Sequence, residues 1–172
     1  MACPIFAAGA SADAVPARAA AVMVTGKLPP APAGVADLKF GEFFRTPVGP
    51  RGLEPTARLQ ALQGRTVRVV GFMVHREQPV PGRFILTAMP LRMSEDEDGL
   101  ADDLPPQALF VQLQQAGDAP PAFVPGLLAL TGTLELGAQD EPDGRVSNVR
   151  LLLDAPSSAA LAAAAATTLS VQ

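Results

Sequence analysis

The chain of 172 residues has a formal net charge of −4 and a hydrophobic content of 48%, which suits one folded domain with a sizeable core. Its only cysteine, Cys3, excludes an intramolecular disulfide framework and a cysteine-based zinc site, and its only histidine, His75, excludes a site built from several histidines. No run approaches the roughly 18 apolar residues that a transmembrane helix needs.

Residues 1–36 are rich in alanine, proline and glycine, which predicts a leader or linker outside the folded domain. Near the start, Ala10-Ser11-Ala12 has the small-x-small pattern of a signal-peptidase site, although no basic segment precedes it. We expect an exported, periplasmic protein that retains the remnant of a secretory signal. The alternative is a cytoplasmic protein with an ordinary Ala-rich leader.

The segment after the leader predicts short structure that leads into a sheet. Residues 37–45 contain three of the eight phenylalanines, which we expect to lie against the core because tryptophan and tyrosine are absent. Residues 54–63 predict a short helix, since Leu59 and Leu62 lie three apart on one face. Gly64 suits the left-handed position that ends such a helix.

Five short strands are predicted between residues 66 and 153, because apolar residues there alternate with small or polar ones between turn signals. The first and fourth strands each carry a central glycine, Gly71 and Gly132, which predicts strong bending and a bulge at Gly71. Asp143-Gly144 predicts a hairpin turn between the last two strands. The predicted strands are Thr66–Val74, Arg83–Ala88, Leu109–Gln114, Leu127–Leu136 and Val146–Leu153.

This pattern predicts an all-β domain over residues 37–154, a small five-stranded OB-like barrel with a short N-terminal helix. The helix that usually separates the third and fourth strands of that fold is not expected, because residues 116–125 are few and rich in proline. A looser five-stranded barrel or an open sandwich is the alternative. Residues 155–172 favour a helix by composition but have little apolar face, so we expect flexible Ala/Pro-rich tails on both sides of the barrel.

The opening of the first strand, Leu62–Val74, reads LQGRTVRVVGFMV and resembles the start of DUF3299, an uncharacterised bacterial family. The resemblance spans residues 59–113, and the later part matches only in its general strand pattern. It implies a small, usually exported OB-like barrel and supplies no catalytic residue. The chain departs from the family where Val74-His75 replaces the usual proline, and in an acidic connection between the second and third strands that lacks cysteine and histidine.

Charge is unevenly distributed along the predicted barrel. Residues 39–92 carry nine basic and three acidic side chains, whereas residues 93–172 carry two basic and twelve acidic ones. Either the two halves compensate each other in the fold, or the first half forms a basic face for an anionic partner. In the second case the candidate binding residues are Arg65, Arg68, His75 and Arg83. An oligonucleotide-binding OB module is then an alternative, although the pI of about 4.9 and the missing tyrosine and tryptophan disfavour it.

Two sets of residues suggest metal binding. Residues 95–103 hold six carboxylates, which suits a hard divalent cation such as Ca²⁺, although such a cluster is more often a solvated surface loop. The candidate ligands there are Glu95, Asp96, Asp98, Asp102 and Asp103. A softer copper site would use Met73 and His75, with Met89 or Met93 nearby.

No catalytic arrangement is recognisable. The sequence has no Gly-x-Ser-x-Gly motif and no glycine-rich phosphate loop, and a Ser-His-Asp triad would depend on the single histidine. We therefore predict a non-enzymatic binding module or accessory subunit that recognises a protein or glycan partner through the loops at residues 78–82 and 93–106. A metal-binding accessory protein is the alternative, and no cofactor beyond a divalent cation is expected.

Overall fold

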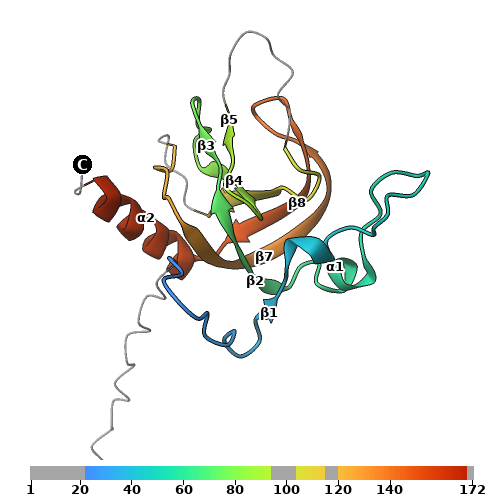
Figure 1. The fold of residues 1–172 in the computed structure, drawn as a ribbon, viewed down its shortest axis with the longest axis horizontal. Helices are drawn as coiled ribbons and strands as arrows, with labels where there is room; N and C mark the ends of the chain where they lie inside the picture. The colour runs from blue at the N-terminus through green and yellow to red at the C-terminus, as the bar shows by residue number, and fades with distance from the viewer. Residues whose placement is uncertain (1–21, 94–103, 115–119, 170–172) are drawn as a thin grey trace, which may run out of the picture.

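The computed structural model describes residues 22–93, 104–114 and 120–169, which fold mainly into β-sheet with two α-helices (Figure 1). The prediction of a mainly β domain is confirmed in this coarse form. Within these residues no helix has both the length and the apolar character that crossing a membrane requires. The elements are β1 (Ala36–Asp37), the 3₁₀ helix η1 (Phe40–Glu42), α1 (Ala57–Ala61), β2 (Thr66–Met73), β3 (His75–Arg76), β4 (Arg83–Thr87), β5 (Arg92–Met93), β6 (Leu109–Leu113), β7 (Leu127–Asp140), β8 (Val146–Leu153) and α2 (Ala155–Leu169).

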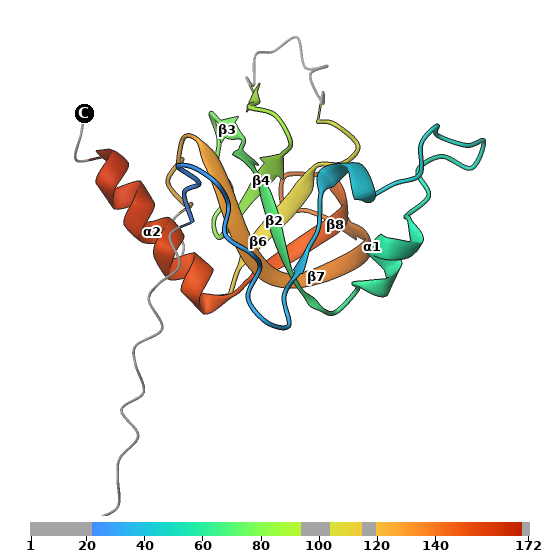
Figure 2. The same cartoon turned by 60° about the horizontal axis from the view of Figure 1, so that its bottom comes forward.

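Six of the strands form one mixed sheet in the order β1-β2-β4-β6-β8-β7. The pairs β1–β2 and β6–β8 are parallel and the others are antiparallel. Strand β2 pairs with β4 at one end and with β7 along residues 66–72, so the pairing of the five long strands returns to its starting strand. Figure 2 shows these strands curving around a common interior. The short strands β3 and β5 form a separate parallel pair.

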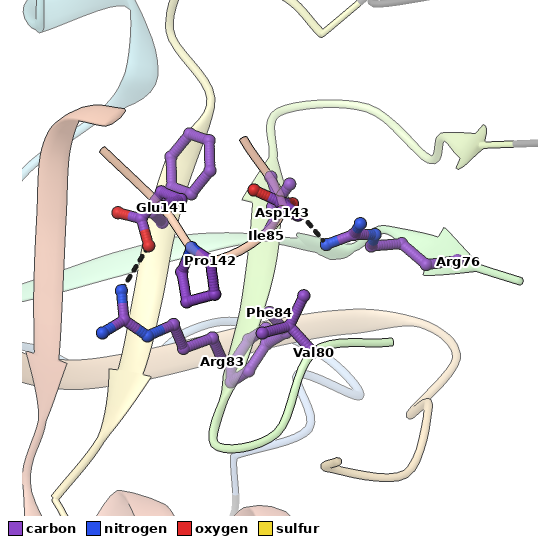
Figure 3. Close-up of a pocket in the computed structure, with 9 residues that line it drawn as sticks. Arg76, Val80, Arg83, Phe84, Ile85, Glu141, Pro142 and Asp143 are labelled. Atoms are coloured by element: carbon purple, nitrogen blue, oxygen red, sulfur yellow. Dashed lines mark hydrogen bonds and ion pairs between the residues drawn. The ribbon is translucent and has the colours of Figure 1, made fainter. Parts of the chain in front are cut away.

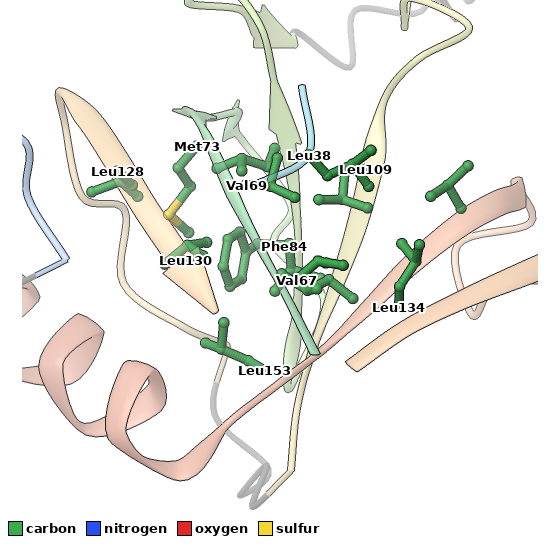
Figure 4. Close-up of a cluster of buried hydrophobic side chains, with 14 of the residues drawn as sticks. Leu38, Val67, Val69, Met73, Phe84, Leu109, Leu128, Leu130, Leu134 and Leu153 are labelled. Carbon is green, nitrogen blue, oxygen red and sulfur yellow. The ribbon is translucent and has the colours of Figure 1, made fainter. Parts of the chain in front are cut away.

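The main core lies between the long strands, and its side chains come from alternate strand positions. In β7, four buried residues alternate with half-buried ones from Leu127 to Leu134, as a strand with one face inside requires. Figure 4 shows the buried leucines of β7 together with side chains of three other strands. They are Leu128, Leu130 and Leu134 of β7, Val67 and Val69 of β2, Phe84 of β4 and Leu109 of β6. Side chains from the segment around η1 and from α1 extend the same cluster, among them Phe40 of η1, the next two phenylalanines Phe43 and Phe44, and Leu59 of α1.

The two central glycines are required by close contacts rather than by a bulge. The register between β2 and β7 is unbroken through Gly71, so the predicted bulge there is wrong. A Cβ on Gly71 would lie 2.7 Å from the Phe40 ring and from the Thr87 carbonyl oxygen. A Cβ on Gly132 would lie 2.3 Å from the Leu152 carbonyl oxygen. The irregularity of the sheet is instead at the far end of β7, after Leu136.

The expectation of flexible tails is wrong for the described part of both ends. At the C-terminus, α2 buries Ala160, Leu161 and Ala165 in the main core. One leucine and a set of small side chains give the helix enough apolar contact, and Asp154 accepts the Ser157 amide proton at 2.7 Å, as an N-cap does. The apolar face expected to be missing is therefore formed by alanines.

At the other end, residues 22–35 form a strap, which starts beside β7 and leads into β1 (Figure 1). Its start is hydrogen-bonded to β7: the Val24 amide donates to the Leu127 carbonyl at 2.8 Å and the Ala129 amide donates to the Val22 carbonyl at 2.7 Å. The Val22 side chain is buried. The prediction of a linker for these residues is therefore wrong. Prolines exclude a regular helix or strand, but they do not prevent the segment from packing against the sheet.

Candidate functional site

Two ion pairs join loops at one end of the β-structure (Figure 3). Arg76 of β3 pairs with Asp143 at 2.9 Å, and Arg83 at the start of β4 forms a salt bridge with Glu141. Both carboxylates belong to the hairpin turn between β7 and β8, and the two arginines flank the connection from β3 to β4. We refer to these four side chains as the clamp. It connects the basic and acidic halves of the chain, as mutual compensation predicts.

The clamp continues into a buried polar network. The Glu141 side chain is only 4% exposed and also accepts a hydrogen bond from the Ser147 hydroxyl. Arg150 donates to the same hydroxyl at 3.1 Å and to the Gly137 carbonyl at 2.7 Å. Because buried charges are costly unless paired, these mutual contacts stabilise the turn in one position.

The environment of Asp143 favours its ionised form. Burial raises the pKa of the Asp143 carboxyl. Hydrogen bonds from the Arg145 side chain and backbone, together with the positive charges of Arg76 and Arg145, lower this pKa and outweigh the effect of burial. The net result is a pKa below the ordinary value of 3.8. Asp143 is therefore ionised at neutral pH and presents a full negative charge to Arg76.

The clamp closes the space beneath it and leaves a hollow on either side. Under Arg76 and Arg83 the remaining cavity is about 10 Å³, no more than one water needs. One neighbouring hollow, of about 170 Å³, lies between Met73, Phe84 and Phe123. The other, of about 380 Å³, shares Phe110 with the clamped space.

The larger hollow, which we name the Phe110 groove, is formed by the outer faces of β6 and β8 together with the segment 104–106. Phe110 is half-buried, whereas Val146 is 53% exposed and Leu53 lies at the groove with its side chain partly in solvent. Arg145 and Asn148 supply the polar side chains of the lining. The groove can thus accept an apolar side chain and offer hydrogen bonds beside it.

The candidate binding residues do not share one surface. Arg65 is exposed just before β2, whereas Arg68 is buried and donates to both carboxylate oxygens of Asp37, at 2.7 and 3.0 Å. The His75 ring lies edge-on to Phe123, with 4.8 Å between the ring centres, and Arg83 belongs to the clamp. Two of the three arginines are therefore neutralised by partners, and a continuous basic face is not formed by this set.

The structure does not describe the acidic loop that was predicted to bind a divalent cation. The acidic set Glu95, Asp96, Asp98, Asp102 and Asp103 lies outside the described residues. Among those that the structure does describe, no three histidine, cysteine, aspartate or glutamate side chains gather as metal ligands would.

The methionines of the proposed soft site are dispersed. Met73 packs in the main core, where its sulfur accepts the Val124 amide proton at 3.5 Å. Met93 belongs to a second cluster with Val74 and Ile85, and Met89 is exposed. The structure therefore does not bring these sulfur atoms together around His75.

Sequence reasoning gave no site role to Arg76, Glu141, Asp143 or Arg150, and it used Asp143 only as a turn signal. The opposite charges of the two halves were the available signal, because they indicated ion pairing between residues distant in sequence. That signal does not say which residues pair, since the partners depend on how β3 and the β7–β8 turn meet in space.

No protein-family model matches the chain, and no curated protein is significantly similar to it. The crystal structure of a DUF3299 family protein from Pseudomonas aeruginosa is similar over 69% of this chain and 91% of its own, with 11% sequence identity and a TM-score of 0.41. A solved structure of the family that residues 62–74 suggest is thus among the similar structures, at this low identity.

Proposed function

We propose that the chain is an OB-type barrel that acts as a non-enzymatic binding module for a protein partner. The ring of strand pairings supports the fold. Counting the five long strands in order, the first pairs with the second and fourth, and the third pairs in parallel with the fifth. OB folds use the face of their second and third strands, together with the loops after the first and fourth, to bind ligands.

The observation that carries this proposal is the contrast between paired charges and exposed apolar groups. At the clamp, the charged side chains neutralise one another, so a ligand gains little from them. Beside it, the Phe110 groove presents Phe110, Val146 and Leu53. Apolar side chains around a hollow are the usual core of a protein interface, surrounded by polar residues.

A protein segment suits the groove better than a nucleic acid or a glycan. Stacking of bases or sugars is usually supported by tyrosine or tryptophan, and the sequence has neither. A peptide needs one apolar pocket with a few hydrogen-bonding groups at its edge. Asn148, whose side chain is exposed, provides such a group at the Phe110 groove.

The proposal is tested by selecting a random peptide library on the full chain and, in parallel, probing a glycan array with the same protein. The groove variant is Val146→Glu, which places a charge in the apolar hollow. The matched control is Val48→Glu, because Val48 is 58% exposed in the loop between η1 and α1 and does not line the groove.

We expect selected peptides to bind Val146→Glu about tenfold or more weakly and Val48→Glu unchanged, as loss of a central interface contact predicts. Peptides that bind both variants with equal affinity would show that the binding site lies outside the Phe110 groove. If a glycan on the array binds the parent chain and its binding is lost in Val146→Glu, the partner at the groove is a glycan and the proposal of a protein partner is wrong.

A further inference from the structure

A second hollow, separate from the Phe110 groove, lies beneath the strap. Its volume is about 430 Å³, within the range of small-molecule sites. Four elements enclose it: the strap, β2, β7 and the first turn of α2. The lining residues on which the argument depends are Lys27, Leu28, Arg68, Ala129, Thr131 and Ser157.

The hollow contains a buried cation. Arg68 alternates in β2 with the core residues Val67 and Val69, yet its side chain is only 8% exposed, and it lines the hollow together with the strap. Its Nε and Nη2 donate to Asp37, and no acceptor for Nη1 is found among the residues that the structure describes. Arginine has five N–H donors in a planar fork, so one edge of the guanidinium remains for a second anion.

Other polar groups in the hollow can add to this donor. Lys27 is exposed on the strap and lines the same space. The buried Ser157 hydroxyl accepts the Thr131 amide proton at 3.2 Å, which leaves its own proton available to donate. Lys27 and Arg68 together carry two positive charges, and Asp37 offsets one of them. The balance favours a ligand with a single negative charge.

The remainder of the lining is apolar. Leu28 and the prolines at 29, 30 and 32 form the strap side, and Ala129 faces them from β7. Small-molecule sites combine such walls with a few polar groups that fix the orientation of the ligand. A ligand that matches this hollow has an acidic head and an apolar tail.

We propose that the hollow beneath the strap binds a medium-chain monocarboxylate. The carboxylate pairs with Arg68 and Lys27 and accepts the Ser157 hydroxyl proton, while the alkyl chain lies along the prolines of the strap. This site is distinct from the Phe110 groove, so it does not depend on the protein-binding function.

The test titrates the full chain with decanoate and with 1-decanol, by calorimetry at neutral pH, where decanoate is ionised. Two variants perturb the hollow without breaking the Arg68–Asp37 pair. Lys27→Gln removes one cation, and Ala129→Phe fills the space without changing any charge. Lys39→Gln is the matched control, because it removes an exposed charge that does not line the hollow.

We expect decanoate to bind the parent chain at least about tenfold more tightly than decanol, as charge-assisted hydrogen bonds predict. Lys27→Gln weakens decanoate by about threefold to tenfold, Ala129→Phe abolishes binding, and Lys39→Gln and Val146→Glu leave it unchanged. Equal affinities for decanoate and decanol, undiminished binding to a folded Ala129→Phe, or no binding to the parent would each overturn the proposal.

Discussion

Replacing Glu141 by glutamine tests whether the clamp holds the β7–β8 turn. The substitution keeps the shape of the side chain and removes the negative charge that faces Arg83. Removal of one partner from a fully buried ion pair costs about 3–5 kcal/mol, because the remaining charge stays buried. Arg83 is 27% exposed and recovers part of its hydration, so we expect a smaller loss of unfolding free energy, about 2 kcal/mol.

A double-mutant cycle separates the pair from its surroundings. The variants are Glu141→Gln, Arg83→Met and the double variant, and we expect a coupling energy of about 1–2 kcal/mol. The matched control is the pair Arg51–Glu54, which is 2.8 Å apart but largely in solvent at Arg51. Its coupling should be no more than about 0.5 kcal/mol, as for other exposed pairs.

Urea denaturation at pH 7 gives the free energies, and hydrogen exchange of the amides at residues 140–146 reports on the turn itself. In the Glu141→Gln variant we expect faster exchange there and unchanged exchange at the centre of β2. The reasoning is refuted if Glu141→Gln is as stable as the parent within about 0.5 kcal/mol, or if its coupling to Arg83 does not exceed that of the exposed pair.

Three further predictions follow from particular contacts. Because the folded pKa of Asp143 lies below 3.8, its contribution to stability is complete above that pH and is lost as the pH falls through the folded value, so Asp143→Asn should flatten the acid limb of a stability–pH curve measured below about pH 4.5. Gly132→Ala should destabilise by about 2–4 kcal/mol in urea, because its Cβ meets backbone, whereas Gly49→Ala, with open space, should stay within about 0.5 kcal/mol of the parent. Leu161→Ala should cost about 2–3 kcal/mol and expose α2 to protease, and unchanged stability would show that the helix is not part of the core.

The five long strands were predictable because their signals are local. Period-two alternation marks which residues face inward, and turn residues mark where each strand stops, so four of the five were placed to within one residue at both ends. The exception is β7, which continues past Leu136 to Asp140. Residues 137–140 are polar and glycine-containing, and only their pairing with β8 extends the strand.

The role of Gly71 was not predictable, although its importance was. A glycine within a strand signals either a bulge or a close approach of another group, and the sequence does not distinguish the two. The deciding neighbours are Phe40, which comes from a separate element, and the Thr87 carbonyl on a different strand. Both contacts depend on tertiary packing, which local sequence patterns do not predict.

The same limit explains why the tails were misread. An Ala-rich segment without a large apolar face is a poor isolated helix, and a proline-rich segment forms no regular structure. Both become ordered when an existing surface offers contacts, as Leu161 and Val22 show by their burial in the main core. Composition describes what a segment can do alone, whereas packing depends on what it meets.

The position of the charges shapes the proposed function in the same way. Read along the sequence, Arg68 and Arg83 belong to a basic half that favours an anionic ligand on one face. In the fold, Arg83 is satisfied by Glu141 and Arg68 by Asp37, so neither gives the outer surface a strong positive field. The proposed protein site therefore rests on the apolar Phe110 groove, and the proposed carboxylate site rests on the edge of Arg68 that Asp37 does not occupy. A basic pattern along the sequence therefore does not become a basic surface in the fold, because Arg68 meets Asp37 of β1 and Arg83 meets Glu141 of the β7–β8 turn.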